Sequence, residues 1–184
     1  MKTFLLAALA GVFLMLGQSV SHADAGYSFS FSVEQKHDAG TKTTTYYSEQ
    51  KNQNWYYKVT MDNKSFKDVS GIEIKYVVFS KQEQFSYDVI QTTGVPLQRH
   101  PGSLTMRMVK NNDTVTFNTD GIALTNVTYN DGYYADEGAK GALRGIWIRV
   151  YVGGQMVAEF MNPTGLSQKV QFDGPPDEKK KKGQ

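Results

Sequence analysis

Apolar and polar side chains alternate with a period of two through much of the chain. The alternation is cleanest at residues 27–33, where aromatic residues and a valine take turns with serines. It returns at 55–61, 72–78 and 104–108. Because successive side chains of a strand point to opposite faces of a sheet, each run predicts a strand with one buried face.

Weaker signals fill the intervals between these runs. Residues 41–50 are rich in threonine and tyrosine, which favour pleated surfaces, and predict a strand. The polar residues 51–54 predict the loop of a hairpin with the run at 55–61. Further strands are expected in the ranges 85–91, 115–117 and 122–129.

The strongest local signal is a hairpin near the C-terminus. Alternating runs at 146–152 and 155–160 are joined by Gly153 and Gly154, which reach positive φ without steric cost. Pro163 lacks the backbone donor that a sheet needs and ends the second strand. A short closing strand is expected at 168–172.

These runs predict nine to eleven short strands and no helix longer than a turn or two. The fold class expected is all-β, an antiparallel β-sandwich forming a single domain over residues 24–172. The polar or glycine-rich stretches 92–103 and 130–142 are interpreted as loops that could face a partner.

The two ends of the chain differ from the body. Residues 1–23 are interpreted as a signal peptide, because Lys2 precedes thirteen apolar residues and Ala23 ends a small-residue cleavage site before Asp24. Ala25 offers a second site, and an uncleaved anchor helix is the alternative. Residues 173–184, with four consecutive lysines, predict a disordered tail. The mature chain is expected in the periplasm or outside a bacterium, without stable membrane insertion.

Composition removes several classes of function. Between residues 24 and 172 the chain carries fifteen basic and fifteen acidic side chains, so no basic face is expected and nucleic acid is not an expected partner. The chain has no cysteine. A lipid-anchored lipoprotein, a disulfide-held domain and a thiolate site are thereby excluded.

Two stretches carry a family resemblance. The segment from Trp55 through Asn63, Lys64 and Ser65 to Phe79 resembles the strand–turn–strand of immunoglobulin-like and fibronectin type III-like domains in uncharacterised secreted bacterial proteins. The segment 145–154 resembles their closing hairpin. The likeness covers about half of the mature chain and implies an immunoglobulin-like sandwich, but no activity.

Residues that could carry catalysis are scarce. His37 and His100 are far apart in the chain and predict no zinc site, and no nucleophile, phosphate-binding or metalloprotease motif occurs. Asp136 and Glu137 could serve a hydrolase, or could bind calcium with Asp131, but no calcium-loop spacing is matched. We therefore expect no enzyme activity, catalytic residue, metal or cofactor.

Aromatic residues are the better candidates for contact with a ligand or a partner. Such rings bury large areas with little loss of entropy, although outward tyrosines can also serve only to stabilise cross-strand pairs. The expected function is non-catalytic binding or assembly with an unknown envelope protein, through loops or by strand addition at a sheet edge. A carbohydrate-binding module with exposed aromatics is the alternative. The candidate contact residues are Tyr46, Tyr56, Trp147, Tyr133 and Tyr134.

Overall fold

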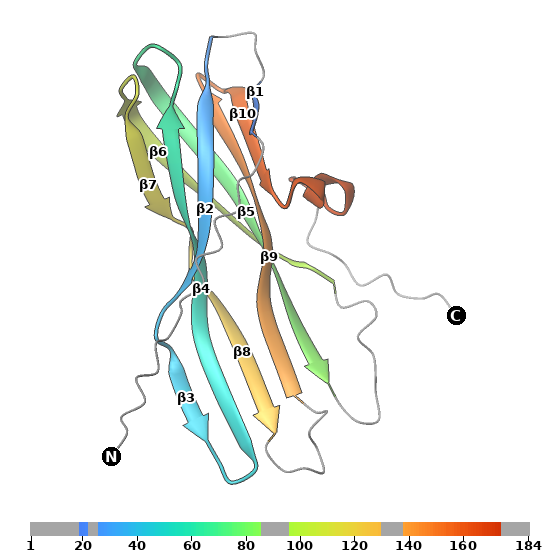
Figure 1. Ribbon diagram of the computed structural model, residues 1–184. Coiled ribbons are helices and arrows are strands. Elements are labelled where there is room, and N and C mark those ends of the chain that lie inside the picture. Colours follow the sequence, from blue (N-terminus) through green and yellow to red (C-terminus); the bar gives the residue numbers. More distant parts are fainter. Residues whose placement is uncertain (1–18, 22–25, 86–95, 130–137, 174–184) are drawn as a thin grey trace, which may run out of the picture.

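The computed structural model describes residues 19–21, 26–85, 96–129 and 138–173, which form ten strands and one short 3₁₀ helix (Figure 1). All strand pairs are antiparallel, so the predicted all-β antiparallel class is confirmed. The elements are β1 (Ser19–Ser21), β2 (Phe29–His37), β3 (Thr41–Thr44), β4 (Ser48–Asn63), β5 (Val69–Phe85), β6 (Gln98–Val109), β7 (Thr114–Asn118), β8 (Ile122–Tyr129), β9 (Gly138–Val152), β10 (Gln155–Asn162) and η1 (Thr164–Gln168).

Three strands are much longer than the sequence pattern predicted. β4, β5 and β9 have 16, 17 and 15 residues and run through most of the molecule's length. The loop predicted at 51–54 is therefore wrong, since these residues belong to β4, and two more are wrong in part, since 98–103 belong to β6 and 138–142 to β9. At 51–54 every side chain is at least partly accessible to water, so this part of β4 needs no apolar face.

One half of the molecule has two layers, and we call it the two-layered half. One layer consists of β2, the 55–63 part of β4, and β7. The other contains β10, β9, β5 and β6 in that order. The rings of Phe31 in β2 and Phe160 in β10 lie 5.5 Å apart across the interface. Apolar side chains of both layers form the main core.

The other half is a single sheet, which we call the single-layered half. There β8 pairs with β4 over residues 48–55 and with β9 over 138–140, while β3 pairs with the opposite edge of β4. The sheet order is thus β3, β4, β8, β9, β5. Figure 1 shows the strands crossing from this sheet into the two layers near the middle of the molecule.

A glutamine side chain occupies the position where β8 separates from β9. Gln82 Nε2 donates to the carbonyl of Thr125 at 2.8 Å, and the Thr125 amide donates to Gln82 Oε1 at 3.2 Å. The side-chain amide thus replaces a neighbouring strand for one residue of β8. Gly141 faces this junction: a Cβ atom there would lie 2.6 Å from Gln82 Oε1 and 2.8 Å from Leu124 Cβ.

A buried asparagine links the turn after β4 to the end of β6, at the end of the two-layered half that lies away from the single-layered half. The side chain of Asn63 is fully buried and donates to the carbonyls of Lys67, Val109 and Lys110 at 2.9–3.1 Å. Asn63 Oδ1 accepts from the amide of Ser65 at 3.0 Å. The predicted strand–turn–strand at these residues is confirmed, and β5 lies between β6 and β9 as a central strand.

The C-terminal hairpin is also confirmed, but the closing strand is not. β9 and β10 pair across Gly153 and Gly154, both with positive φ, and β10 ends at Asn162. The predicted strand at 168–172 is wrong: η1 and the residues after it form a covering segment instead. Leu166 and Phe172 pack from this segment on a second apolar cluster with Val77, Phe79 and Trp147, on the outer face of β5 and β9.

The described part of the chain contains no helix long and apolar enough to cross a membrane. Of the predicted signal peptide, only residues 19–21 are described, and they form β1. The predicted strand residues 86–91 and the tail residues 174–184 lie outside the described part.

Candidate functional site

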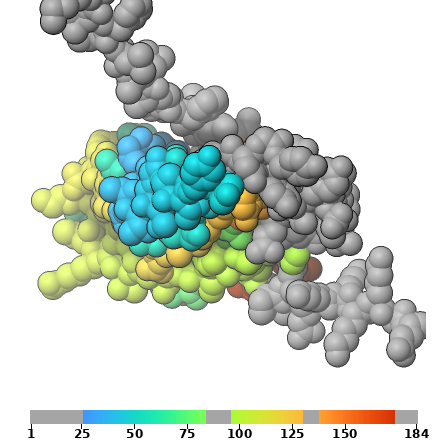
Figure 2. Space-filling view, turned by 90° about the horizontal axis from the view of Figure 1, so that it is seen from below, coloured from blue at the N-terminus to red at the C-terminus, as the bar shows by residue number. Residues whose placement is uncertain are grey.

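The β3–β4 hairpin ends in a three-residue turn at the free end of the single-layered half. Thr45 and Ser48 close this turn: the Thr45 amide donates to the Ser48 carbonyl at 2.8 Å, and the Ser48 amide donates to Thr45 Oγ1 at 3.0 Å. The closed turn leaves Tyr46 and Tyr47 at its apex. Viewed from this end, the cyan atoms of the hairpin lie foremost in the molecule (Figure 2).

The two tyrosines at this apex are unusually open to water. Tyr46 is 88% exposed and Tyr47 58% exposed. Their ring centroids lie 4.8 Å apart at an angle of 82°, an edge-to-face pair. Single exposed apolar residues are ordinary on protein surfaces, but two adjoining rings form a local patch. We call Tyr46 and Tyr47 the tyrosine tip.

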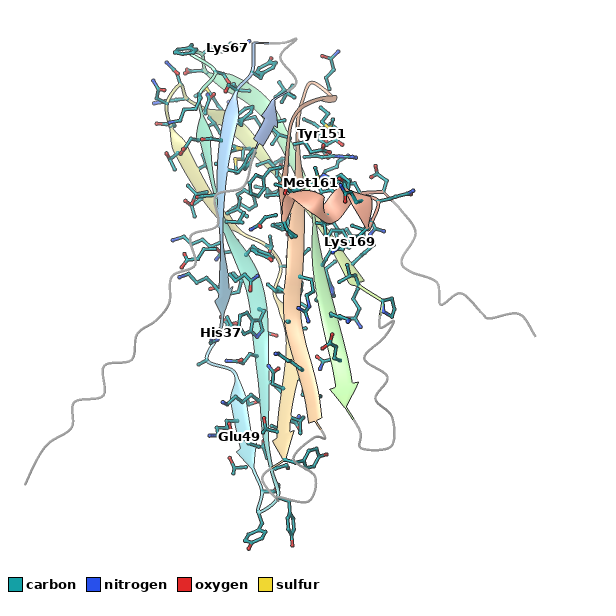
Figure 3. The ribbon with its side chains drawn as sticks, turned by 45° about the vertical axis from the view of Figure 1, so that its right-hand side comes forward. His37, Glu49, Lys67, Tyr151, Met161 and Lys169 are labelled. Atoms are coloured by element: carbon teal, nitrogen blue, oxygen red, sulfur yellow. The ribbon has the colours of Figure 1, made fainter. Side chains whose placement is uncertain are left out.

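Charged side chains brace the hairpin just behind the tyrosine tip. Lys42 and Lys51 are directly opposite one another in the strand register, an arrangement that by itself is repulsive. Glu49 offsets the repulsion, since its carboxylate lies 2.7 Å from Lys42 Nζ and 2.9 Å from Lys51 Nζ. Hydrogen bonds from Lys42 and then Lys51 lower the pKa of Glu49. Figure 3 shows Glu49 close to the hairpin end.

The structure separates the sequence-predicted contact residues. Tyr46 lies on the tyrosine tip, whereas Tyr56 is half-buried within β4, opposite Lys36 of β2. Tyr133 and Tyr134 lie outside the described residues. The predicted site therefore does not form one surface in the described part of the chain.

The prediction that Trp147 is an exposed ring is wrong. Its side chain is only 5% exposed, because Phe172 of the covering segment packs edge-on against it with centroids 5.5 Å apart. Trp147 Nε1 donates to Glu159 at 3.0 Å, and Arg149 donates to the same carboxylate at 2.7 Å. The alternation in β9 correctly gives Trp147 an outward direction, but it carries no information about the segment that covers that face.

Tyr47 is the residue that sequence reasoning missed as a contact. Residues 41–50 were assigned to one continuous strand, in which Tyr46 and Tyr47 would face opposite sides of a sheet. Thr45 and Ser48, two short hydroxyl side chains that form local hydrogen bonds with the backbone, were the available signal for a turn.

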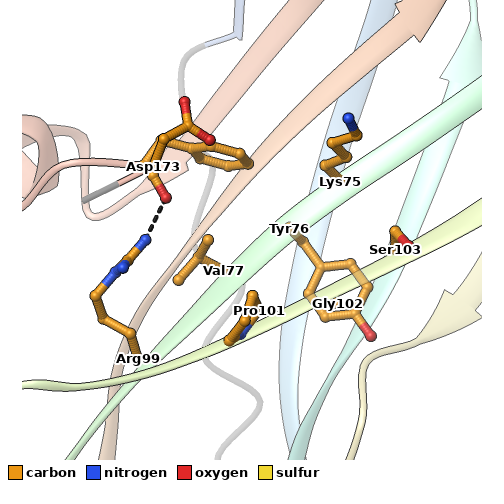
Figure 4. Close-up of a pocket in the computed structure, with 9 residues that line it drawn as sticks. Lys75, Tyr76, Val77, Arg99, Pro101, Gly102, Ser103 and Asp173 are labelled. Carbon is orange, nitrogen blue, oxygen red and sulfur yellow. Dashed lines mark hydrogen bonds between the residues drawn. The ribbon is translucent and has the colours of Figure 1, made fainter. Parts of the chain in front are cut away.

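A shallow depression of about 470 Å³ lies on the outer face of β5 and β6 beside the covering segment (Figure 4). Its cations already have partners: Arg99 donates to the carbonyl of Phe172, and Lys75 lies 3.4 Å from Glu73. Tyr76, whose pKa is raised by burial, passes so close to Gly102 that a Cβ there would lie 2.3 Å from the ring. The depression thus offers a weaker ligand site than the tyrosine tip.

The remaining polar candidates lie apart from one another. The His37 ring packs at a tilt of 45° against Trp55, with ring centroids 4.6 Å apart, and His100 is hydrogen-bonded to Ser80 at 2.9 Å. Among the described residues, no group of three histidine, aspartate or glutamate side chains is placed to hold a metal ion. Asp131, Asp136 and Glu137 lie outside the described part.

Comparison with known proteins adds little. No family model matches the chain, and no curated protein matches it. Among solved structures, the chain is similar to a protein from Akkermansia muciniphila, with 12% identity over 85% of this chain and 82% of the other and a TM-score of 0.38. It is also similar to the putative ApaA protein from Bordetella pertussis, with 11% identity over 73% and 92% and a TM-score of 0.34. Likenesses this weak say nothing of function.

Proposed function

We propose that this chain is an exported, non-catalytic binding protein that presents the tyrosine tip to a protein partner in the bacterial envelope. The single observation that carries the proposal is the exposed edge-to-face pair of Tyr46 and Tyr47 on a closed, braced turn. Tyrosine is enriched where proteins bind, because a rigid ring buries much area while its hydroxyl finds a polar partner.

The position of the pair argues for a binding role over a structural one. An edge-to-face pair contributes about 0.5–1.5 kcal/mol, and removing one exposed ring affects stability only slightly. Both rings lie beyond the last paired residues of β3 and β4, Thr44 and Glu49. Fold stability therefore gives no reason for two aromatic rings here, whereas insertion into a partner's pocket does.

The ring geometry favours a protein over a glycan. Sugar rings stack flat on aromatic faces, so a platform for two neighbouring sugar units needs rings that are nearly coplanar. Tyr46 and Tyr47 lie at 82° to one another and leave room for flat stacking on one ring at a time. Two perpendicular rings instead make a compact wedge, which suits a concave, mostly apolar pocket.

The proposal also includes export of the chain and an immunoglobulin-like sandwich as its fold. The N-terminal pattern of residues 1–23 supports a signal peptide, and a periplasmic or extracellular location follows from it. The two packed layers with a shared core support an immunoglobulin-like sandwich as the scaffold. The single-layered half departs from that scaffold, because it extends the strands beyond the core and holds the tip away from it.

Site-specific crosslinking tests the proposal. A photoreactive phenylalanine analogue at position 46 of the exported chain is expected to crosslink to one envelope protein in living cells. The matched control carries the same analogue at position 66, because Phe66 is 91% exposed as a single ring in the turn between β4 and β5. Equal crosslinking from both positions, or none from position 46, contradicts a specific contact at the tip.

A double variant supplies the second measurement. Tyr46→Ser with Tyr47→Ser is expected to abolish co-purification of the crosslinked partner while the thermal unfolding midpoint stays within about 2 °C. Phe66→Ser is expected to retain the partner. Binding of the unmodified chain to an immobilised glycan, lost in the double variant, would instead favour the carbohydrate alternative.

A further inference from the structure

The outer edge of β10 is covered by a strand from the chain's own N-terminal region. β10 pairs with β9 along one side, and β1 pairs antiparallel with its other side. Ser19, Val20 and Ser21 lie opposite Phe160, Glu159 and Ala158 in this register. β1 thus occupies the backbone positions that would otherwise be the open edge of this layer.

The occupying strand lies within the segment that the sequence marks for removal. Cleavage after Ala23 would separate β1 from the folded chain, whose next strand, β2, belongs to the other layer. We infer that processing opens the β10 edge at Ala158–Phe160 as an acceptor for an extended, uncharged segment of another protein, added antiparallel as β1 is. This inference rests on the export part of the proposed function, and not on the tyrosine tip.

The β10 edge at Ala158–Phe160 lacks the features that protect three of the other outer strands, β2, β3 and β6, from pairing. Outer strands are commonly protected by lysines or prolines. β2 carries Lys36, β3 carries Lys42 and β6 carries Pro101. The acceptor stretch of β10 contains only one charge, Glu159, and that carboxylate is engaged by Arg149 at 2.7 Å.

The acceptor stretch is also held in place before any partner arrives. Ala158 and Phe160 belong to the main core, and the ring of Phe160 lies 5.5 Å from that of Phe31 in the opposite layer, so these side chains anchor the strand. On the opposite face, Glu159 accepts from Trp147 and Arg149. A strand fixed on both faces loses little further freedom when a partner pairs with its edge, which favours binding.

The register indicates what kind of segment fits. A second copy pairing through its own β10, centred on the acceptor stretch, would bring Glu159 directly opposite Glu159 of that copy, a like-charge pair that is unfavourable. In β1 the residue opposite Glu159 is Val20, flanked by two serines. The expected occupant therefore has a β-branched residue between small uncharged ones and comes from a different protein.

Hydrogen–deuterium exchange compares the two forms of the chain directly. The full chain, with Ala23→Arg and Ala25→Arg to block both cleavage sites, is expected to protect amides of Ala158–Phe160 about tenfold more than the chain beginning at Asp24. Amides of β5 should exchange equally in both forms, which controls for global unfolding. Equal exchange at Ala158–Phe160 in the two folded forms would overturn the inference.

A synthetic peptide tests acceptance itself. The probe is a fluorescent peptide of residues 17–23, measured by anisotropy against the chain beginning at Asp24. Binding is expected to weaken at least about tenfold when alternate peptide amides are N-methylated, because methylation removes ladder donors without changing side chains. The uncleaved chain should bind at least about tenfold more weakly, since β1 already fills the edge. Equal binding by both forms, or no effect of N-methylation, would contradict strand addition.

These outcomes are separable from those of the proposed function. The Tyr46→Ser, Tyr47→Ser variant should bind the peptide as the unmodified chain does, so loss of the tip contact leaves this inference standing. N-terminal sequencing of the protein isolated from cells tests cleavage independently of both binding experiments. A chain that still begins at Met1 would overturn the inference of an open edge, whereas the tip contact would stand, because an uncleaved anchor helix also exports the chain.

Discussion

The two halves of the molecule are built from the same long strands but in different environments. In the two-layered half, β4 alternates buried and accessible residues from Tyr57 to Asn63, and one face contributes to the core. In the single-layered half, the same strand reads Ser48-Glu-Gln-Lys-Asn-Gln-Asn54, and β3 is exposed at all four positions. One strand therefore changes from a half-buried element to one with water on both sides.

This difference separates stability from surface function. Burial of apolar area is the main stabilising contribution to folding, and nearly all of it lies in the two-layered half. The single-layered half is held by its backbone ladder, by a few apolar residues near the junction and by surface ion pairs such as Lys42 with Glu49. Its hairpin end can therefore change in sequence, or carry exposed rings, at little cost to the fold.

A matched pair of valines tests the contrast most strongly. Val150 is fully buried in the two-layered half, and Val127 lies partly exposed in β8. Val150→Ala is expected to lower the free energy of unfolding by about 2 kcal/mol, from lost apolar transfer and a residual cavity. Val127→Ala should lower it by less than about 1 kcal/mol. Urea unfolding followed by circular dichroism measures both losses. Equal losses of unfolding free energy would contradict the claim that side chains are packed more tightly in the two-layered half.

The junction between the halves should be sensitive to a single added methyl group. Gly141→Ala would place Cβ 2.6 Å from Gln82 Oε1 and 2.8 Å from Leu124 Cβ, forcing β8 and β9 apart. We expect a loss of about 1–2 kcal/mol. Gly165→Ala is the control, because nothing lies within 4 Å of its Cβ position. If thermal unfolding midpoints of the two variants coincide, the close approach at the junction is unimportant.

The smallest effect is expected from acid. Asp62 in β4 accepts from Thr114 at 2.6 Å and from Ser30 at 3.1 Å, and these bonds, Thr114 first, lower its pKa below 3.8. A carboxyl group with a lowered pKa stabilises the fold above its ordinary pKa, and this contribution disappears as the pH falls through the folded value. Stability should therefore decline below about pH 4.

Asp62→Asn isolates this contribution. The variant should be slightly less stable than the original chain at pH 7 and should lose less stability between pH 4 and pH 2. Glu49→Gln is the matched control in the single-layered half, since the pKa of Glu49 is also lowered, but by Lys42 and Lys51 instead of hydroxyl donors. A Glu49→Gln variant with the larger change in acid sensitivity would reverse the contrast between the halves.

Sequence reasoning worked best where one face of a strand is buried. The runs 72–78 and 146–152 correspond to parts of β5 and β9 because their alternation reflects a face pressed against the core. It failed at 51–54 and 138–142, where polar or glycine-rich residues form strands in the single-layered half. Periodicity reports burial, and strands that bury neither face carry no such signal.

The candidate site shows the same division. The aromatic content of the sequence points to Tyr46. Its edge-to-face contact with Tyr47 depends on a turn that begins at Thr45, and a prediction of one continuous strand over 41–50 does not include that turn. Trp147 was expected at the surface, and the packing of the covering segment, with Leu166 and Phe172, buries it.

By itself, the sequence determined that this chain is an antiparallel all-β protein with a tight glycine hairpin and a strand that stops before Pro163. These properties are local, since alternation, positive φ and the missing proline donor act within a few residues. The tertiary structure alone decided where the sheet divides into two layers, which rings remain in water and which edge β1 covers. Those outcomes depend on contacts between residues far apart in the chain, such as Gln82 with Thr125 and Val20 with Glu159.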